Sequence, residues 1–502
     1  PPPPPPPPPP QAAASSSVEV FDRGTDGGRS DPANNNWTKW IQEKIFREEN
    51  IKVSFVPIPR SSEVPGLTTM MAAGNAPDVS FTYDAGAVTT FSVQGGLFDM
   101  NPHVDSLMPD LKTWLGEDEA IPGKKLIYRL LDSKTGKLYA VPARRTILAR
   151  EGLFIRKDWL DKLGLPLPQT VQEFYNALAA FKEKDPGGVG RDRVLPFALL
   201  GVHTAFMITR GAFLDPHLSD KDLWINGYLM QDGEKEAARF LNRMYNAGLI
   251  DRDFPLYNND PTVPENLAKS GLAGSFSSNW DHAYRDSPGI LAMLRQNIPG
   301  AVFEPISPFA NSQGRTPREI YEPAGAYTFI PSYSKAPEAS MRYLNWLSRF
   351  ENCNFLQVGP EGIVHTVVNG IPQLKAAAGG WIQNSGFNLD YTIPQNGLNL
   401  GDPAKNMKAL TGGYRPEFVE LVERAYALAM KDGKPYPVVP VTLTAGVEYA
   451  ATLSGKENAL KVNAITCPPD QFDKVWDQGI KEWLAAGGQA VIDERRAKYT
   501  AP

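Results

Sequence analysis

The chain has 502 residues, and 51 Lys and Arg residues against 56 Asp and Glu residues give a net charge of -5, with 42% hydrophobic residues. This length corresponds to about two or three globular domains with a large core. The near-neutral charge argues against a nucleic-acid-binding protein, which normally carries a basic patch. The 2 Cys and 5 His exclude a disulfide scaffold and argue against a metal-dependent hydrolase, although one Cys353–Cys467 bridge stays open. No run of ~18 apolar residues predicts a membrane span.

The N-terminal segment is ten Pro followed by Gln-Ala-Ala-Ala-Ser-Ser-Ser. Pro-rich chain adopts an extended polyproline helix, and the Ala and Ser residues add flexibility. We therefore predict a disordered tether over residues 1–17, of natural or recombinant origin. A ligand for a proline-recognition domain is the alternative, but no basic residue flanks the run to orient it. Because the chain has neither an initiator Met nor a signal peptide, we expect a mature or recombinant form.

Apolar runs and helical periodicities alternate from Val18 onward. In chain order they predict a strand over 18–21, a helix over 37–45, a strand over 51–58, a helix over 67–73 and a strand over 79–83. This order is typical of parallel βαβ units in a doubly wound sheet, where ligands bind beyond the carboxyl ends of the strands. We therefore expect Asp26, in the loop after the first strand, and Tyr83, at the end of the third, to lie at a cleft.

The rest of the chain repeats this pattern and becomes mostly helical towards its C-terminus. It predicts strands over 138–142, 153–155 and 272–276, and helices over 171–183, 234–247, 341–350, 416–431 and 472–486. A single βαβ domain does not need this much additional structure. We therefore predict an α/β protein with two lobes and a helix-rich C-terminal part.

Motifs for phosphate binding and nucleophilic catalysis are missing from the sequence. Gly136-Lys137 is followed by Leu138 rather than Ser or Thr, no GxGxxG follows a strand, and no GxSxG occurs. A glycosidase needs only two carboxyl groups ~5 to 9.5 Å apart, and the sequence alone cannot pair them. The acidic run over 117–119 is most simply a solvated turn.

Trp280 stands just after a strand-like stretch and is flanked by polar residues, including Asp281. A flat ring at a strand end can stack on the apolar face of a sugar, while neighbouring amides and carboxylates bind its hydroxyls. The alternative is a partly buried interface Trp. Trp224 and Trp381 are weaker candidates for the stacking role.

Arg144 and Arg145 follow the strand predicted over 138–142. Two adjacent guanidinium groups ordinarily lie in a solvated turn. If this strand end faces the cleft, at least one of them can make a bidentate contact with a ligand carboxylate or hydroxyl pair. The protein would then prefer an anionic glycan.

Six segments stand in an order that is typical of one family. They are 67–79 (LTTMMAAGNAPDV), 96–100 (GLFDM), 138–142 (LYAVP), 153–164 (LFIRKDWLDKLG), 246–251 (NAGLID) and 359–362 (GPEG). Together they resemble extracellular solute-binding proteins that serve ATP-driven oligosaccharide importers, over most of the chain from Val18 to Tyr499. The subgroup that the chain resembles is the large lipoprotein type, similar to alginate-oligosaccharide-binding proteins.

The resemblance implies a two-lobed, periplasmic-binding-protein-like fold that closes on an oligosaccharide. We expect residues 18–142 plus about 276–334 in the N-terminal lobe, and residues from about 143–275 plus 335–502 in the helix-rich C-terminal lobe. The implied partners are an oligosaccharide, neutral or acidic, and the permease subunits of an ABC transporter. No nucleic acid and no cofactor are expected, and the protein is expected to be a monomer.

The resemblance also implies a tether outside the cell through a lipidated N-terminal Cys. Because no such Cys is present in the sequence, attachment to the membrane is an inference. The expected location is the surface of a Gram-positive bacterium, and the periplasm is the alternative.

Alginate binders of this subgroup carry a calcium loop, and the corresponding segment here departs from it. Asp185 is present, but Gly187 and Val189 offer no side-chain oxygen, and Arg193 and Val194 stand where an acidic pair is expected. Calcium needs six to eight oxygen ligands. We therefore predict that the loop is free of metal and structural.

The resemblance strengthens some of the candidate ligand contacts. Trp280 matches the cleft Trp of the subgroup by context, and Arg144, Arg145 and the strand over 321–327 fall where the family presents ligand contacts. The other candidates rest on geometry. The complete ligand-binding set is Trp280, Arg144, Arg145, Tyr83, Asp26, Glu322, Tyr327, Trp381 and Asp281, with no catalytic and no metal-binding residue.

Two functions follow from these patterns. The first is the binding component of an importer, which closes around an oligosaccharide, docks on a permease and needs no catalytic group. The second is an extracellular polysaccharide hydrolase or lyase that uses the same cleft. It would require a titratable group with a strongly shifted pKa beside Trp280, for which the sequence offers Asp281 and His282. We expect a binding protein and not an enzyme.

Overall fold

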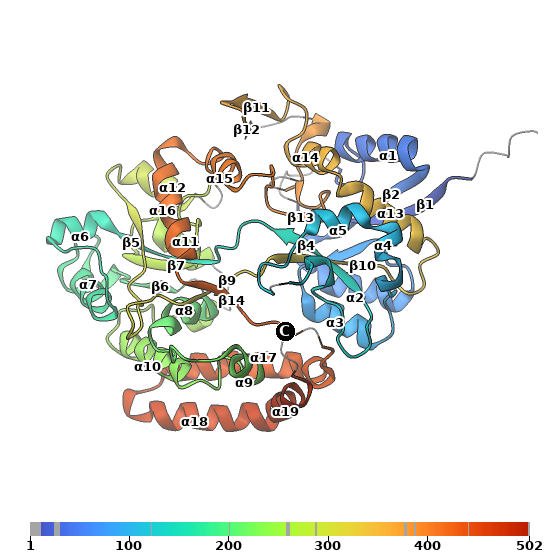
Figure 1. Ribbon diagram of the computed structural model, residues 1–502. Coiled ribbons are helices and arrows are strands. Elements are labelled where there is room, and N and C mark those ends of the chain that lie inside the picture. The colour runs from blue at the N-terminus through green and yellow to red at the C-terminus, as the bar shows by residue number, and fades with distance from the viewer. Residues whose placement is uncertain are drawn as a thin grey trace, which may run out of the picture. The chain divides into compact units, whose positions relative to one another are not determined.

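The computed structural model describes residues 12–24, 31–121, 123–199, 201–257, 262–286, 289–375, 379–385, 388–439 and 441–499. The chain divides into two compact units, both with strands and helices (Figure 1). Unit 1 comprises Pro1–Thr146, Pro323–Asn406 and Pro440–Thr442, and unit 2 comprises Ile147–Glu322, Met407–Val439 and Leu443–Pro502. The predicted α/β class is therefore confirmed.

Unit 1 contains a parallel pair of strands next to a mixed sheet. Its strands are β1 (Ala14–Asp22), β2 (Ile51–Pro59), β3 (Ser80–Thr82), β4 (Ala140–Arg145), β10 (Ala324–Phe329), β11 (His365–Val368), β12 (Ile371–Leu374) and β13 (Gln395–Asn396). β1 and β2 are parallel, and a parallel bridge joins Val18 to Val79 beside β3. β10 lies between β3 and β4 and is antiparallel to both. The parallel βαβ arrangement predicted for the first three strands is confirmed.

Helices cover the strands of unit 1. They are α1 (Asn36–Glu49), α2 (Glu63–Ala73), α3 (Ala85–Val93), α4 (Val104–Leu107), α5 (Pro109–Leu115), α13 (Pro337–Leu347) and α14 (Phe350–Val358). An Asn cap starts α1: the Asn35 side chain accepts hydrogen bonds from the amides of Trp37 and Thr38 at 2.9 and 3.1 Å. The buried Trp37, Ile41 and Ile45 then turn one face of α1 towards the core.

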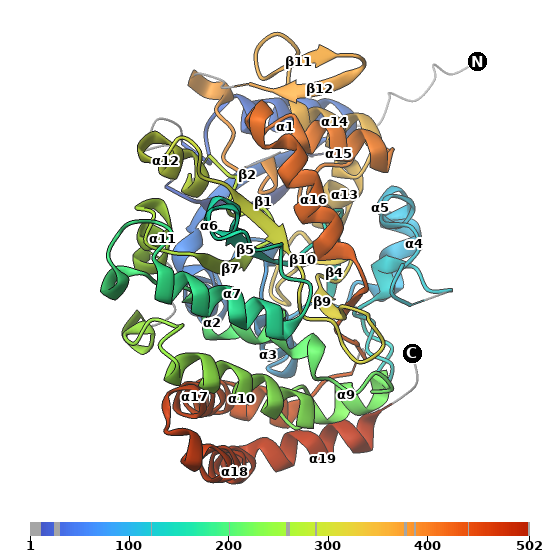
Figure 2. The same cartoon turned by 90° about the vertical axis from the view of Figure 1, so that its left-hand side faces the viewer.

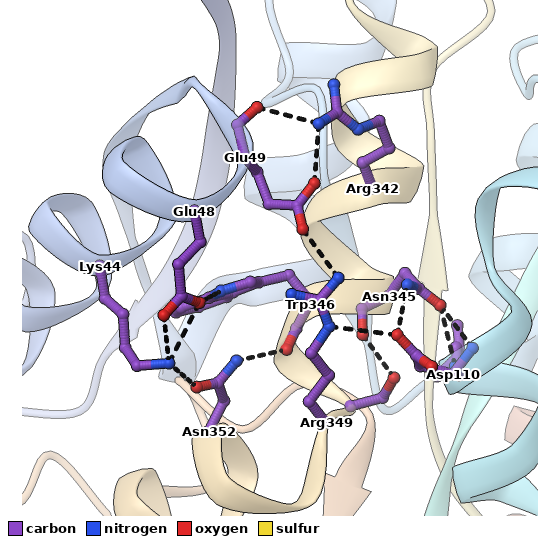
Figure 3. Close-up of polar contacts among 11 residues, drawn as sticks. Lys44, Glu48, Glu49, Asp110, Arg342, Asn345, Trp346, Arg349 and Asn352 are labelled. Atoms are coloured by element: carbon purple, nitrogen blue, oxygen red, sulfur yellow. Dashed lines mark hydrogen bonds and ion pairs between the residues drawn. The ribbon is translucent and has the colours of Figure 1, made fainter.

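A polar network fastens the two main segments of unit 1 to each other (Figure 3). Arg349 donates to Glu49 at the end of α1 (2.7 Å) and to Asp110 in the first turn of α5 (3.1 Å). Arg342 on α13 also donates to Glu49, at 2.7 Å. Asn345 accepts from the Asp110 amide at 2.7 Å and so caps α5. Residues that are far apart in the sequence therefore form one compact unit.

Unit 2 has its own sheet, with the strand order β6-β7-β5-β8. Its strands are β5 (Glu151–Arg156), β6 (Ala198–Leu199), β7 (Ser275–Asn279), β8 (Phe303–Ile306), β9 (Arg318–Ile320) and β14 (Gly433–Pro435). β5 is antiparallel to β7 and to β8, whereas β6 is parallel to β7. β9 and β14 form a separate parallel pair.

Most of the helical residues of unit 2 lie in the middle and at the C-terminus of the chain. The helices are α6 (Lys157–Leu163), α7 (Val171–Lys184), α8 (Val202–Thr209), α9 (Asp220–Asn226), α10 (Asp232–Asn246), α11 (Thr262–Lys269), α12 (Ile290–Asn297), α16 (Val419–Met430), α17 (Thr444–Thr466), α18 (Phe472–Trp483) and α19 (Gln489–Lys498), while α15 (Pro403–Thr411) crosses the division between the units. Figure 2 shows α17, α18 and α19 gathered with α9 and α10. The predicted helix-rich C-terminal part is present.

The predicted lobe boundaries differ from the observed units. Residues 276–322 belong to unit 2, because β7 and β8 both pair with β5. Residues 335–406 belong to unit 1, because β13 pairs with β4 and α13 packs in the core of that unit. The sequence-based prediction assigned each of these two segments to the opposite lobe and is wrong, because the spacing of strands in a sequence does not say which strands pair.

The predicted tether over residues 1–17 is wrong at its C-terminal end. Residues 1–11 lie outside the described part of the chain, but β1 already begins at Ala14 and pairs with Ile51. Ser16 is 2% exposed and its hydroxyl bonds that of Ser340 at 3.0 Å. Ser is polar, but its small side chain fits in this strand. Pairing with β2 satisfies the backbone N–H and C=O groups of the segment.

The acidic run over 117–119 is not a wholly solvated turn. Asp118 is buried, and both of its carboxylate oxygens accept hydrogen bonds from Nη1 of the buried Arg129, at 2.8 and 2.6 Å. Its neighbours Glu117 and Glu119 have exposed side chains, 62% and 61%. Asp118 is therefore buried in unit 1, whereas the side chains of Glu117 and Glu119 face solvent.

Two further findings concern the membrane and the thiols. Across the part of the chain that the structure describes, no helix combines the length and the apolar character needed to span a bilayer.

Cys353 and Cys467 are both free thiols. Cys353 is fully buried, and burial raises the pKa of its thiol well above the ordinary value.

Candidate functional site

The carboxyl ends of the strands of unit 1 bring several charged and aromatic residues to one edge. We call this the carboxyl edge of unit 1. Arg23 follows β1, Arg60 follows β2, Tyr83 follows β3 and Arg145 ends β4. β4 runs parallel to β3 because both are antiparallel to β10, so the two ends meet at the same edge. Tyr83 and Arg145 therefore lie at the same strand-end edge of this sheet.

Arginine side chains surround the Tyr83 ring. The Arg60 guanidinium carbon lies 5.0 Å from the centre of that ring and 5.3 Å from the centre of the Phe21 ring. Arg23 donates two hydrogen bonds of 2.7 Å to Asp390, which holds its guanidinium in place. Burial raises the pKa of the Tyr83 hydroxyl, and Asp390 adds to this, while Arg23, Arg145 and Arg60 oppose it. The hydroxyl therefore stays protonated at neutral pH and can donate a hydrogen bond.

A cavity of about 550 Å³ opens beside this ring, lined by residues 60–65 and 83–86. Glu63 accepts hydrogen bonds from the Thr82 hydroxyl (2.6 Å) and the Tyr83 amide (3.0 Å). Asp84 accepts from the amides at the start of α3. A cavity of this size, with an aromatic wall and a few fixed polar groups, can bind a small polar molecule such as a sugar.

The two adjacent arginines have different surroundings. Arg144 donates to the carbonyl oxygens of Leu115 and Glu117 and to the Glu119 carboxylate, so it holds the turn after α5. Arg145 donates to the Gly325 carbonyl at 3.2 Å. Most donors of Arg144 are therefore committed within unit 1.

The other candidates in unit 1 lie in less open places. Tyr327 is 6% exposed and pairs with Thr82 and Pro142 inside the sheet. Trp381 is partly buried, and its ring meets the Trp37 ring edge-on at 5.0 Å. Asp26 lies outside the described residues.

Unit 2 has a carboxyl edge of its own, where β7 ends and the antiparallel β5 begins. Glu151 is opposite Asn279 in the ladder, and Trp280 follows directly. Trp280 is 5% exposed, and its ring meets the Tyr426 ring edge-on at 5.3 Å. Its position at a strand end agrees with the sequence, but the ring is mostly packed in an apolar core. Glu322 is partly buried and is the last residue of this segment of unit 2.

Asp281 and His282 have protein partners rather than free side chains. Asp281 accepts from Arg285 at 2.9 and 2.6 Å and from the Tyr414 hydroxyl at 2.5 Å. A ring nitrogen of His282 bonds Glu265 at 2.8 Å, and burial lowers the pKa of this His. Both side chains are therefore held by other protein groups. A side chain held in this way is less available to act as a general acid or base on a ligand.

The sequence analysis missed a charged group on the edge of unit 2. Arg150 forms an ion pair with Glu319, lies near Glu151 and stacks on the Tyr321 ring with its guanidinium carbon 5.3 Å from the ring centre. Arg150 directly precedes β5, Glu151 is the first residue of β5 and Glu319 belongs to β9. The predicted site was built from residues that follow strands. The charged pair directly before the apolar run of β5 was the available signal.

The pKa of Glu151 makes a pH dependence testable. Burial raises it to about 7, with Glu319 adding to the effect and Arg150 and Arg285 opposing it. In the unfolded chain this carboxyl releases its proton near pH 4.5, so unfolding becomes easier as the pH rises from about 4.5 to 7. We expect the stability contributed by this group to fall by up to about 3 kcal/mol over that window.

Denaturant unfolding of the wild type and of Glu151→Gln across this pH range measures the effect. The variant should show a flatter dependence of unfolding free energy on pH. Glu119→Gln, at an exposed position, is the control and should follow the wild type. Equal slopes for the wild type and Glu151→Gln would contradict the assignment.

The loop after α7, compared above with a calcium loop, is held by its own Asp. The carboxylate of Asp185 accepts from the amides of Val189 (3.0 Å) and Gly190 (2.7 Å), and Lys162 donates to the Pro186 carbonyl at 2.9 Å. Among the residues that the structure describes, no group of three or more His, Cys, Asp or Glu side chains could hold a metal ion. Backbone amides and an ammonium group therefore contact the oxygens of this loop.

We expect calcium and EDTA to leave the melting temperature unchanged, because the Asp185 carboxylate already has donors. Asp185→Ala should cost about 1.5–3 kcal/mol of unfolding free energy, since it removes two hydrogen bonds to a charged group. Asp185→Asn, which keeps an acceptor, should cost less. Thermal unfolding measures both effects, and a rise in melting temperature with calcium would contradict this interpretation.

Comparison with known proteins shows the class of protein to which the chain belongs. The alginate-binding protein AlgQ2, whose structure was solved without calcium ion, shares the fold over 97% of this chain and 98% of its own, with a TM-score of 0.67 and 19% identity. The two α/β units therefore have the fold of the periplasmic-type solute-binding proteins. The chain matches the model of the bacterial extracellular solute-binding protein family over residues 31–351, and it belongs to that family. It is a non-catalytic transport component.

Two relatives from Bacillus subtilis (strain 168) are similar in sequence. Lipoprotein LipO is 31% identical over 232 residues, and the match covers 43% of this chain and 43% of LipO. The chain thus spans less than half the length of this relative. The polygalacturonan/rhamnogalacturonan-binding protein YtcQ is 25% identical over 470 residues, which cover 90% of this chain and 86% of YtcQ.

Proposed function

We propose that the protein is the substrate-binding component of an ABC-type sugar importer, which captures an oligosaccharide and delivers it to a membrane permease. The observation that carries this proposal is the chemistry of the two carboxyl edges. Each edge combines aromatic rings with charged hydrogen-bonding groups, around Tyr83 in unit 1 and around Trp280 in unit 2. Membership of the solute-binding family supports a binding role without turnover.

Sugars match this combination of groups. The C–H face of a pyranose ring packs on an aromatic ring, and its hydroxyls exchange hydrogen bonds with carboxylates, guanidinium groups and Tyr. Tyr83 and Arg60 supply these groups at the cavity of unit 1. In unit 2 we propose that Trp280 and Asp281 contribute, together with the charged side chains of Arg150 and Glu151.

An acidic chain fits the charges of unit 1 better than a neutral one. Three arginines, Arg23, Arg60 and Arg145, act on Tyr83, while Asp390 pairs with Arg23 and Glu63 pairs with Arg60. Arginine binds carboxylates with two parallel hydrogen bonds. The names of YtcQ and of the alginate-binding AlgQ2 point to acidic polysaccharides for those two proteins.

Capture requires the two units to act as lobes that close on the ligand. The chain passes between the units at Thr146, Glu322 and Asn406, among other points, and a hinge needs only a few residues of this kind. We further propose a monomer that works outside the cell as a lipid-anchored surface protein, as the name of LipO indicates for that relative. The periplasm is the alternative location.

Small-angle X-ray scattering tests ligand capture by closure. We expect one of the two classes of sugar, oligouronates or neutral oligosaccharides, to bind. Addition of that sugar should lower the radius of gyration of the protein, because the ligand stabilises the closed form. An oligosaccharide shown to bind without any change in scattering would contradict closure. If calorimetry on the same samples detects no binding of either class of sugar, sugar capture is contradicted.

A further inference from the structure

A second cavity, of about 430 Å³, lies within unit 2 beside the β9–β14 pair. Its charged lining includes Arg210, Arg315, Arg318, Glu319, Asp432 and Lys434. β9 and β14 are the last strands before the chain leaves unit 2 at Glu322 and Val439. The cavity is therefore next to two of the segments that connect unit 2 to the rest of the chain.

Most of the charged groups around this cavity are paired. Arg315 pairs with Asp432 at 3.3 Å, and Lys434 with Asp220 at 2.6 Å. Arg210 approaches the fully buried Glu234 at 3.3 Å. Of the remaining carboxylates, Glu319 is held by Arg150. Asp215 accepts from the His217 amide and keeps its negative charge, but it lies at an exposed position.

Arg318 differs from the other cations of this cavity. It donates to the Ser307 hydroxyl and, at 3.5 Å, to the Glu151 carbonyl oxygen, and its buried Nε has no hydrogen-bond partner. Within the described part of the chain no carboxylate lies close enough to form an ion pair with it. Burial lowers the pKa of Arg318 to about 10, and Asp432 offsets only part of this. The group still carries its charge at neutral pH.

A buried cation without a counter-ion is costly, and proteins normally pair such groups. Here the neutral contacts to Ser307 and Glu151 satisfy some N–H groups but do not balance the charge. We propose that this cavity binds a small oxyanion group, with the Arg318 guanidinium as its charged partner. The oxyanion is either a carboxylate of the transported glycan or a free inorganic anion, and both share the planar or tetrahedral oxygen pattern that a guanidinium recognises.

Thermal unfolding with sodium sulfate tests the free-anion source without any sugar. At constant ionic strength, sulfate should raise the melting temperature of the wild type and of Arg315→Met, but not of Arg318→Met. Arg315 is the matched control, because it lines the same cavity but is largely exposed and already paired. Without sulfate, Arg318→Met should melt at or above the wild-type temperature, because an unpaired buried charge is removed.

Calorimetry with trigalacturonate and a neutral trisaccharide tests the glycan source, and this arm rests on the proposed function. Arg318→Met should bind trigalacturonate about tenfold more weakly than the wild type does. Its affinity for the neutral trisaccharide should stay within about twofold of the wild-type affinity. Dependence on Arg318 in either arm supports the site and identifies the source. If Arg318→Met matches the wild type in both arms, the site is disproved. If no glycan binds, the proposed function fails while the sulfate arm still decides this inference.

Discussion

Asp118→Ala should lower the free energy of unfolding by about 3–5 kcal/mol, because it removes the carboxylate that pairs with the buried Arg129 guanidinium. The side chains of Arg129 and Asp118 are 1% and 0% exposed, and the ion pair is 2.6 Å long. Asp118 also accepts from the Ala120 amide at 2.9 Å, so the turn loses a second bond. Denaturant unfolding monitored by circular dichroism measures the change.

Glu117→Ala, one residue away, is the matched control. Its carboxylate pairs with Lys125 on the surface, with side chains 62% and 46% exposed. Exposed pairs contribute about 0–1 kcal/mol, so this variant should stay close to the wild type. Equal losses for the two substitutions would show that the buried pair is not the source of the stability.

Trp280→Ala should reduce both stability and affinity. The ring is 5% exposed and packs against Tyr426, so its removal should cost about 3–5 kcal/mol of unfolding free energy. If the ring also forms the apolar side of the binding edge, affinity for the oligosaccharide should fall by at least about 1 kcal/mol, roughly fivefold. Calorimetry well below the melting temperature measures the second effect.

Trp346→Ala separates these two effects of Trp280→Ala. Trp346 is fully buried on α13 in unit 1, where its indole donates to Glu48 at 2.8 Å. Its loss should destabilise the protein by a similar amount without changing affinity, because the residue belongs to neither carboxyl edge. An unchanged affinity in Trp280→Ala would remove this Trp from the proposed binding site.

The strand-helix alternation of the N-terminal segment was sufficient to predict the parallel strands of unit 1 and the place of Tyr83. Local apolar periodicity determines which residues form strands, and parallel βαβ connection then determines which ends meet. The direction of the later strands is a property of long-range pairing. For that reason Arg150 and Glu151, at the start of the antiparallel β5, were not predicted, although Glu151 is opposite Asn279 and the Arg150 carbonyl accepts from the Trp280 amide.

Burial was the second property that the sequence did not reveal. Asp118 stands between two exposed Glu residues, and only its contact with Arg129 distinguishes it from them. The Trp280 ring is covered by Tyr426 of α16, a helix much later in the chain. Arg318 is similar, because its hydrogen-bond partners are Ser307, which follows β8, and Glu151 of β5. These features follow from packing between distant segments, which residue spacing does not encode.

Titration calorimetry of the wild-type protein against neutral and uronic-acid oligosaccharides, followed by chromatography of the recovered sugar, tests the central claim most directly. We expect saturable binding of at least one chain and recovery of that chain at its original length, because a solute-binding protein holds its ligand without turnover. Shortened or unsaturated products would contradict the binding function. Failure of every chain in both classes to bind would contradict the assignment of an oligosaccharide ligand.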